Sequence, residues 1–290
     1  MHMMSSGRCL ALALAVAVAV AGSACARTPS PEQKRTSPMS GTVTTGRTIN
    51  GHTYSDAPVD VKLGPNTFRI PANYLDSQIA PWSIEVVTLV IEWPDMTPTP
   101  PGARANPRTN DFRKEIHASM NYVDRVPIEG LLARYSSNEA LTEPDSVERG
   151  DPVDRLDLRI AQPETLGLTP YAIDEEKMAV YVKAYEAHYG KPPTRNPAFE
   201  DDWYVARDSG GNLTTFIKCD SVKFRKDGIR LEGDQVIDEE EEEVVAGCTH
   251  HLVDVENKLS ITLNYHRAFL RDWKRMEKAI RDVLARTKVG

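Results

Sequence analysis

The stretch LSITLNYHRAFLRDWKRMEKAIRDVLART, residues 259–287, contains two hydrophobic periods in succession. In its first part every second residue is apolar, from Leu259 to Tyr265, which predicts a strand with one buried face. From about residue 267 the apolar spacing changes to three and four residues, which predicts an amphipathic helix over 267–287. The apolar stripe of this helix comprises Leu270, Trp273, Met276, Ile280, Val283 and Leu284.

The chain before this stretch contains further strand pairs that are joined by turn residues. Residues 251–255 are predicted to pair with 259–265, and 203–206 with 214–219 across the turn DSGGN (208–212). Residues 222–224 and 229–231 flank the turn KDG (226–228), which predicts one more hairpin.

The first half of the chain has a different strand signal. Residues 84–93, IEVVTLVIEW, form a nearly continuous β-branched run, so we expect a central strand that is buried on both faces. Segments 115–126 and 155–160 alternate and predict strands, whereas 175–188 predicts a helix that ends at Gly190. The fold class expected is therefore α+β, with mainly antiparallel sheet, a few segregated helices and the long C-terminal amphipathic helix.

Composition excludes several classes of protein. The 290 residues include 42 Asp and Glu against 35 Lys and Arg, and the formal net charge is −7. Nucleic-acid binders usually carry a basic surplus, so no nucleic-acid partner is expected. Only one apolar run approaches the length of a membrane span, which argues against a polytopic membrane protein. Four cysteines in a chain of this length are too few for a disulfide scaffold.

The N-terminus has the features of an export signal. Arg8 precedes the apolar run Leu10–Ala21, and small residues follow it, so residues 1–24 are interpreted as a signal peptide. Residues 21–25, AGSAC, resemble a bacterial lipobox, which implies lipidation of Cys25, although Gly22 departs from the usual apolar residue. The alternative is ordinary cleavage after Ala24 or Ala26, which would leave a soluble periplasmic protein.

The residues after Cys25 are rich in Thr, Ser, Pro, Gly and Arg. Such a composition buries too little apolar surface to offset the entropy of ordering, so residues 25–58 are predicted to form a disordered tether. Residues 59–290 are predicted to form a folded periplasmic domain, or two subdomains over 59–160 and 161–290.

Two cysteines remain in the predicted folded part, Cys219 and Cys248. An even pair in an oxidising compartment favours a disulfide, which would close a loop of about 30 residues. The rival interpretation is a metal site that includes His250 and His251. Structural zinc spacing is absent, and adjacent residues on a strand point to opposite faces, so we favour the disulfide and expect no metal.

We find no motif that predicts catalysis or a cofactor. The sequence lacks a nucleophile elbow, a phosphate-binding loop, a dinucleotide fingerprint and a zinc-protease motif, so we expect a non-enzymatic protein. An acidic run is the most distinctive charged feature, and its interpretations are a solvated loop, a steering surface for a basic partner or a calcium site. The candidate partner-binding residues are Asp238, Glu239, Glu240, Glu241, Glu242 and Glu243.

Three local patterns together resemble a known group of proteins. They are FRIPANYL (68–75) with WPD (93–95), the two cysteines followed by LNYHR (263–267), and LRDW (270–273). This combination resembles proteobacterial periplasmic lipoproteins of the secretion-system toxin-immunity type. The group has no shared contact motif, so no toxin-binding residue is transferred.

The resemblance implies an immunity protein that binds and blocks a secreted antibacterial toxin or effector in the periplasm. A lipid anchor would hold the protein to a bacterial membrane, with the outer membrane favoured. The alternative is a structural or assembly lipoprotein of the cell envelope that has no toxin partner.

Overall fold

The computed structural model of the protein describes residues 43–108, 110–239 and 245–289. Its α-helices are α1 (Leu131–Tyr135), α2 (Glu175–Tyr189) and α3 (Trp273–Thr287). Its strands in the first half are β1 (Thr45–Ile49), β2 (His52–Ser55), β3 (Pro58–Leu63), β4 (Asn66–Pro71), β5 (Val86–Glu92) and β6 (Glu115–Tyr122). Those in the second half are β7 (Arg159–Ala161), β8 (Thr169–Ile173), β9 (Asp202–Arg207), β10 (Leu213–Cys219), β11 (Ile229–Glu232), β12 (Gln235–Asp238), β13 (Gly247–Asp254), β14 (Leu259–His266) and β15 (Lys288–Val289).

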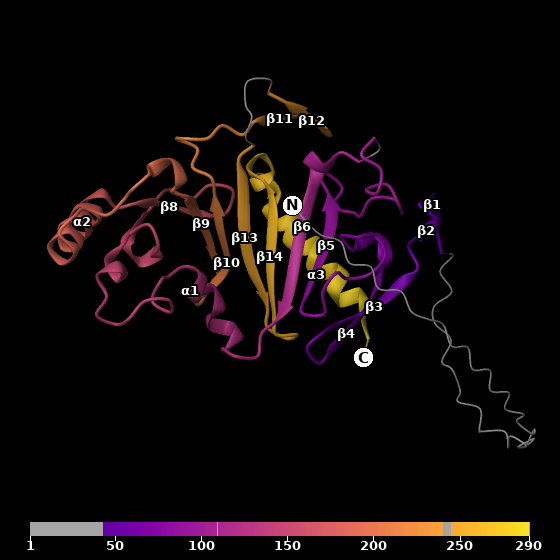
Figure 1. Ribbon diagram of the computed structural model, residues 1–290, viewed down its shortest axis with the longest axis horizontal. Helices are drawn as coiled ribbons and strands as arrows, with labels where there is room; N and C mark the ends of the chain where they lie inside the picture. Colours follow the sequence, from indigo (N-terminus) through magenta and orange to yellow (C-terminus); the bar gives the residue numbers. More distant parts are fainter. Residues whose placement is uncertain (1–42, 109, 240–244, 290) are drawn as a thin grey trace, which may run out of the picture. The chain divides into compact units, whose positions relative to one another are not determined.

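An eight-stranded sheet is the centre of the fold (Figure 1). Its strands follow the order β5-β6-β14-β13-β10-β9-β8-β7, and every neighbouring pair is antiparallel. Helix α3 runs across one face of this sheet (Figure 1). The predicted α+β class, with a mainly antiparallel sheet and a long C-terminal helix, is confirmed.

Helix α3 covers the main core. Its stripe residues Met276 and Ile280 are fully buried, as are Ile261 and Leu263 on β14. The indole Nε1 of Trp93 donates a hydrogen bond of 2.9 Å to Asp272, immediately before α3. The apolar stripe read from the sequence is therefore the surface by which the helix packs on the sheet.

A three-stranded sheet, β15-β4-β3, lies beside this core. The short strand β15 directly follows α3 and pairs with β4, with Lys288 opposite Phe68. Phe68 and Ile70 of β4 are fully buried in the same core as α3. The last described strand thus adds an edge strand to the sheet that β3 and β4 form.

Strands β1 and β2 form a hairpin within the segment predicted as tether. A Cβ on Gly46 would lie 2.1 Å from the carbonyl oxygen of Pro101, so the hairpin packs closely on the proline-rich loop 96–108. Residues 45–55 are thus part of the fold, and the prediction that order begins near 59 is wrong for them. Residues 1–42, including Cys25 and the apolar run, lie outside the described residues.

The run 84–93 contains β5, but its predicted central position is wrong. Strand β5 is the edge of the eight-stranded sheet, paired only with β6 along its length. Its outer side is covered instead by an isolated bridge from Leu75 to Leu89 and by a hydrogen bond from Asp76 N to Thr88 O. Leu89 and Ile91 are buried in the main core on one face and Val90 is buried on the other, so the predicted burial on both faces is confirmed in an edge strand.

Two other local predictions are wrong. Residues 222–224 form no strand, and Ile229 pairs with Asp238 instead, so the turn lies at residues 233–234. In the segment 155–160, a 3₁₀ turn over Leu156–Leu158 precedes the short strand β7. The hairpins β9–β10 and β13–β14 and helix α2 are confirmed.

The eight-stranded sheet includes strands from both proposed subdomains, 59–160 and 161–290. Strand β6 pairs with β14, with His117 opposite Asn264. The described residues belong to one compact unit, so a boundary at 160 does not separate the sheet. A second, smaller core lies under α1 and comprises Leu132, Leu156, Trp203, Val205 and Phe216. No helix in the described part of the chain is sufficiently long and apolar to span a bilayer.

Candidate functional site

The face of the eight-stranded sheet opposite α3, called here the open face, is the candidate site. Successive side chains on a strand alternate between faces, so the strand register places the open-face residues in rows. One row comprises Val90, His117, Asn264, Thr249, Lys218 and Trp203. The next comprises Thr88, Ser119, Thr262, His251, Phe216 and Val205. The middle of this face is therefore polar, whereas the α3 side is apolar. The ends of the two rows are buried, with Trp203, Phe216 and Val205 in the smaller core under α1.

One end of the open face forms a hollow of about 530 Å³, called here the upper hollow. Four strands contribute to its floor: Glu115 and His117 from β6, Lys218 from β10, Thr249 from β13 and Asn264 from β14. Phe112 stands on its rim with 71% of its surface exposed. An exposed aromatic beside a polar floor is typical of a protein-binding surface.

Charges in the upper hollow are partly removed from water. Burial lowers the pKa of the Lys218 ammonium, and it raises the pKa of the Asp201 carboxyl. The Lys218 Nζ also lies 4.6 Å from the centre of the Trp203 ring. Groups that have already lost part of their hydration discriminate strongly between partners of matching and opposing charge.

Glu115 and His117 form the most connected polar pair of the upper hollow. The His117 Nε2 lies 2.9 Å from one oxygen of Glu115, and the amide of Asn110 donates to the other. Burial raises the pKa of Glu115, but these hydrogen bonds and the nearby positive charges outweigh it and leave the pKa below its ordinary value. Glu115 is therefore a fixed negative charge in the hollow.

The opposite end of the open face forms a second hollow of about 610 Å³, the lower hollow. Its lining combines apolar residues with the charged residues Glu85, Asp124 and Arg125. The apolar residues include Ile84, Val86, Tyr122, Leu131 and Tyr135. The hydroxyl groups of Tyr135 and Ser260 are 2.9 Å apart, so α1 is held against β14 at this end. The open face thus offers two hollows of mixed polar and apolar lining on one sheet.

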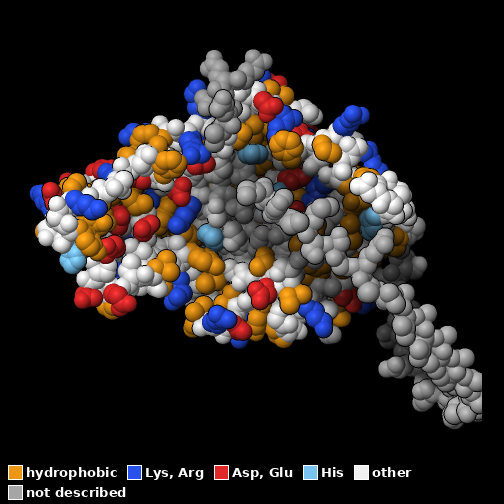
Figure 2. Space-filling view, viewed as in Figure 1, with side chains coloured by type: hydrophobic (Ala, Val, Ile, Leu, Met, Phe, Trp, Pro, Cys, Tyr) orange, Lys and Arg blue, Asp and Glu red, His pale blue; other side chains and the backbone are white. Residues whose placement is uncertain are grey.

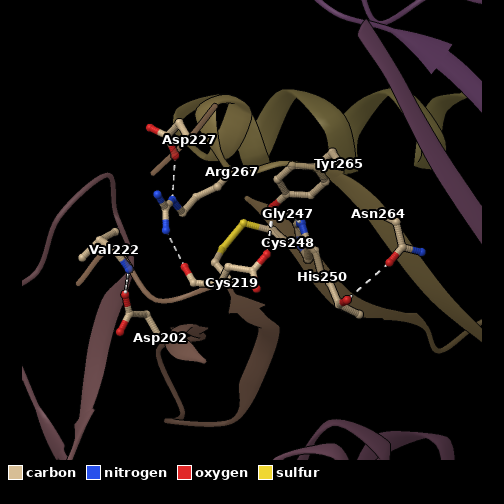
Figure 3. Close-up of a disulfide and its surroundings, with 12 residues drawn as sticks. Asp202, Cys219, Val222, Asp227, Gly247, Cys248, His250, Asn264, Tyr265 and Arg267 are labelled. Carbon is tan, nitrogen blue, oxygen red and sulfur yellow. Dashed lines mark hydrogen bonds and ion pairs between the residues drawn. A yellow bond between two sulfur atoms is a disulfide. The ribbon is translucent and has the colours of Figure 1, made fainter. Parts of the chain in front are cut away.

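A disulfide lies beside the upper hollow (Figure 3). Cys219 and Cys248 are directly opposite each other on β10 and β13, and the predicted bond between them is confirmed. His250 faces α3, whereas His251 faces the open side, so the metal interpretation is wrong. Among the described residues no cluster of three or more His, Cys, Asp or Glu is placed to hold a metal ion.

Arg267 fixes the segment that follows the disulfide-bonded β10 (Figure 3). Its guanidinium donates to the carboxylate of Asp227 at 2.7 Å and to the carbonyl oxygens of Asp220 and Arg225. Asp220 in turn accepts a hydrogen bond from Gly247 N, at the start of β13. The base of the excursion between β10 and β13 is therefore held by a covalent bond and by a buried cation.

The predicted acidic surface is only partly described. Asp238 ends β12 and forms an ion pair of 2.7 Å with Arg113, while Glu239 is exposed. The remaining candidates, Glu240 to Glu243, lie outside the described residues. Asp238 borders a hollow with Phe112 and Arg113, next to the upper hollow, so its side chain is engaged rather than free. A partner-binding role for this run stays a prediction.

The open-face residues were not among the site residues predicted from the sequence. A signal was present, because Glu115, His117, Ser119 and Asn121 alternate with the apolar residues of β6. Figure 2, in the same view as Figure 1, shows acidic, basic and hydrophobic side chains interspersed over the part of the molecule that carries α2.

Comparison with known proteins adds a close relative. The chain is 73% identical to Smlt3025, an immunity protein of the Stenotrophomonas maltophilia type IV secretion system, whose structure is solved. The alignment covers 85% of this chain and 99% of that one, with a TM-score of 0.82. This chain belongs to the family of that immunity protein. The resemblance to the toxin-immunity type is thereby confirmed.

Other comparisons give less. The iron-regulated outer membrane lipoprotein FrpD of Neisseria meningitidis aligns with 79% of this chain and 93% of its own, at 9% identity and a TM-score of 0.41. That likeness is too low to inform fold or function. The chain matches no protein-family model and no curated protein.

Proposed function

We propose that this protein is an immunity protein that protects its cell by binding a toxin delivered by a secretion system. The observation that carries the proposal is the 73% identity to an immunity protein over 99% of that protein's length. The open face supports it, because a rigid sheet with two hollows supplies a surface that a toxin can cover.

We further propose that the protein acts in the periplasm. Residues 1–24 would direct export, Cys25 would carry the lipid, and the residues from Cys25 to the first described strand at Thr45 would form the tether. The disulfide between Cys219 and Cys248 supports this placement, because disulfides persist in oxidising compartments.

The proposed mechanism is stoichiometric occlusion rather than catalysis. A protein that covers the active cleft of a toxin needs shape, charge and rigidity but no reacting group. Titration of the toxin's activity with purified protein tests this. We expect complete inhibition at an equimolar ratio, whereas inactivation by substoichiometric amounts would indicate an enzyme.

A competition assay tests the protective function. The gene is deleted together with its neighbouring toxin gene, and the strain is challenged with siblings that produce the toxin. We expect killing of the deletion strain and survival when the intact gene is restored. Unchanged survival of the deletion strain would reject the immunity function.

The lipid anchor has a matched control within the signal segment. Cys25→Ala should move the protein from the membrane fraction to the soluble fraction, whereas Cys9→Ala should leave it with the membrane. Retention of the Cys25→Ala variant in the membrane fraction would reject lipidation at this position.

A further inference from the structure

Four apolar side chains project from the segment 79–86, next to the lower hollow. Their exposed surface fractions are 39% for Ile79, 81% for Trp82, 91% for Ile84 and 43% for Val86. We call these four residues the apolar ridge. Single exposed apolar residues are ordinary, but four of them on one short segment are a candidate interaction site.

The ridge is held in place by its own hydrogen bonds. The buried side chain of Gln78 donates to the Thr99 hydroxyl at 2.9 Å and to the carbonyl oxygen of Pro100. The indole Nε1 of Trp82 donates to the carboxylate of Asp76 at 3.1 Å. A segment ordered before binding loses little entropy when a partner docks, so its apolar area contributes efficiently to affinity.

The ridge continues into the lower hollow. Ile84 and Val86 belong to the ridge and also line that hollow, facing Tyr122, Leu131 and Tyr135. An exposed tryptophan next to an apolar recess is the arrangement in which a few residues supply most of the binding energy. The ridge and the apolar part of the lower hollow therefore adjoin at the edge of the open face, beside the charged residues Glu85, Asp124 and Arg125.

The charges beside the ridge indicate what kind of partner fits. The segment from 76 to 86 contains two acids, Asp76 and Glu85, and neither lysine nor arginine. The adjoining lower hollow adds one acid, Asp124, and one base, Arg125, and the guanidinium of Arg104 donates to the carbonyl oxygen of Asp76. Acids therefore outnumber bases around the ridge. Bacterial membranes are anionic and attract basic segments, so this ridge is poorly suited to a lipid surface. It is complementary to a protein surface whose apolar side chains are flanked by Lys or Arg.

Another group of exposed apolar side chains has the opposite surroundings. Phe199 and Phe224 have Arg225 and Lys223 over their rings, at 5.9 and 5.2 Å. Cations cover part of the apolar surface of that group, whereas the ridge has none in its own segment. The ridge is therefore the stronger candidate for a hydrophobic anchor.

We propose that the apolar ridge and the lower hollow anchor the toxin, and that the toxin segment bound there carries apolar side chains flanked by Lys or Arg. This inference rests on the proposed immunity function and names its principal contact. The upper hollow then contributes selectivity through its partly desolvated charges, while the ridge supplies most of the affinity.

Calorimetric titration tests the anchor, with the full processed protein and the secreted toxin encoded beside its gene as the probe. Trp82→Ala and Ile84→Ala should each raise the Kd by about 30-fold or more. Glu85→Lys should raise the Kd by about tenfold at low salt and by less at high salt. Val180→Ala, at a residue 68% exposed on α2, is the matched control and should change the Kd by less than about twofold.

The outcomes separate the two proposals. If the wild-type protein binds the toxin and the Trp82→Ala and Ile84→Ala variants bind it equally well, the anchor is rejected and the immunity function stands. If the wild-type protein does not bind the toxin, the proposed function fails. Circular dichroism and the Tm of each variant exclude unfolding as the cause of lost binding.

Two further measurements exclude other occupants of the ridge. Wild-type protein without its lipid should not bind vesicles of phosphatidylethanolamine and phosphatidylglycerol, and it should sediment as a monomer. Vesicle binding or self-association that Trp82→Ala abolishes would overturn the assignment of the ridge to a toxin.

Discussion

The imidazole Nε2 of His250 on β13 lies 2.9 Å from the Oε1 of Glu277 on α3, inside an otherwise apolar layer. His250 is fully buried, and the Glu277 side chain is 13% exposed. Thr215 donates to the same carboxylate oxygen at 2.6 Å, and the hydroxyl of Tyr265 is 3.3 Å from the other ring nitrogen of His250. This polar cluster fixes the position of α3 on the sheet.

Glu277→Gln should destabilise the fold by about 2–4 kcal/mol at pH 7, because it removes a charged acceptor from a buried cluster. Burial raises the pKa of the Glu277 carboxyl, but the interactions with His250, Thr215 and Arg281 lower it by more. The pKa therefore lies below its ordinary value. The wild type should therefore lose stability as pH falls through that lowered pKa, and the variant should lose less. Urea unfolding between pH 7 and 3 measures both effects. Lys278→Gln, at an exposed neighbour, should change neither.

His251 on the open face should make stability depend on pH in a different range. Burial, with the charges of Lys218 and His250, lowers its pKa to about 4. The unfolded chain binds a proton below about pH 6.5 while the folded protein does not, so stability falls as pH decreases from about 6.5 to 4. The loss should reach about 3 kcal/mol in the wild type and be absent in His251→Asn. Equal pH profiles of the two proteins would contradict this origin.

Replacement of both Cys219 and Cys248 by Ser should lower the free energy of unfolding by about 3–4 kcal/mol, because the unfolded chain gains the freedom of an open loop. Equilibrium urea unfolding with and without a thiol reductant measures the change. The reductant should bring the wild type to the stability of the double variant and leave that variant unaffected. A reductant effect on the double variant would assign the stabilisation to another source.

Gly64 and Gly51 allow a steric effect to be separated from backbone strain. Both have positive φ, at 60° and 80°, but only at Gly64 would a Cβ meet other atoms, at 2.3 Å from the ring of Tyr122. Gly64→Ala should therefore cost about 1–3 kcal/mol more than Gly51→Ala. Thermal unfolding of the two variants measures the difference. Equal Tm values would show that the Tyr122 ring moves aside without cost.

Elements with local causes were predictable, and those that depend on distant pairing were not. Helix α2 is preceded by Asp174, whose carboxylate accepts from the N–H groups of Glu176 and Lys177, and is followed by Gly190, with φ of 72°. Both signals are within the segment itself. The apolar run of β5 is an equally clear local signal for a strand. Its position at the edge, however, depends on Leu75 and on β6, which lie along its two sides.

The candidate site was less predictable than the fold for the same reason. Alternation in β6 and β14 indicates that each has a polar face, but only the register places His117 opposite Asn264 and Asn264 opposite Thr249. The tether prediction failed at the β1–β2 hairpin because its residues are almost all exposed and polar, so composition could not distinguish them from a linker. The hairpin is ordered by its packing on the proline-rich loop rather than by an apolar pattern of its own.

The pairing of β15 with β4 has a consequence for the order in which the chain folds. Lys288 must pair with Phe68, more than two hundred residues away, before the three-stranded sheet is complete. A chain that is made from its N-terminus cannot form this contact until residue 288 has been synthesised, and such long-range contacts form slowly. Until then the three-stranded sheet lacks one of its strands, so the finished fold forms late. A tag fused directly after β15 should therefore slow the pairing of β15 with β4, whereas a tag placed before β1 should not.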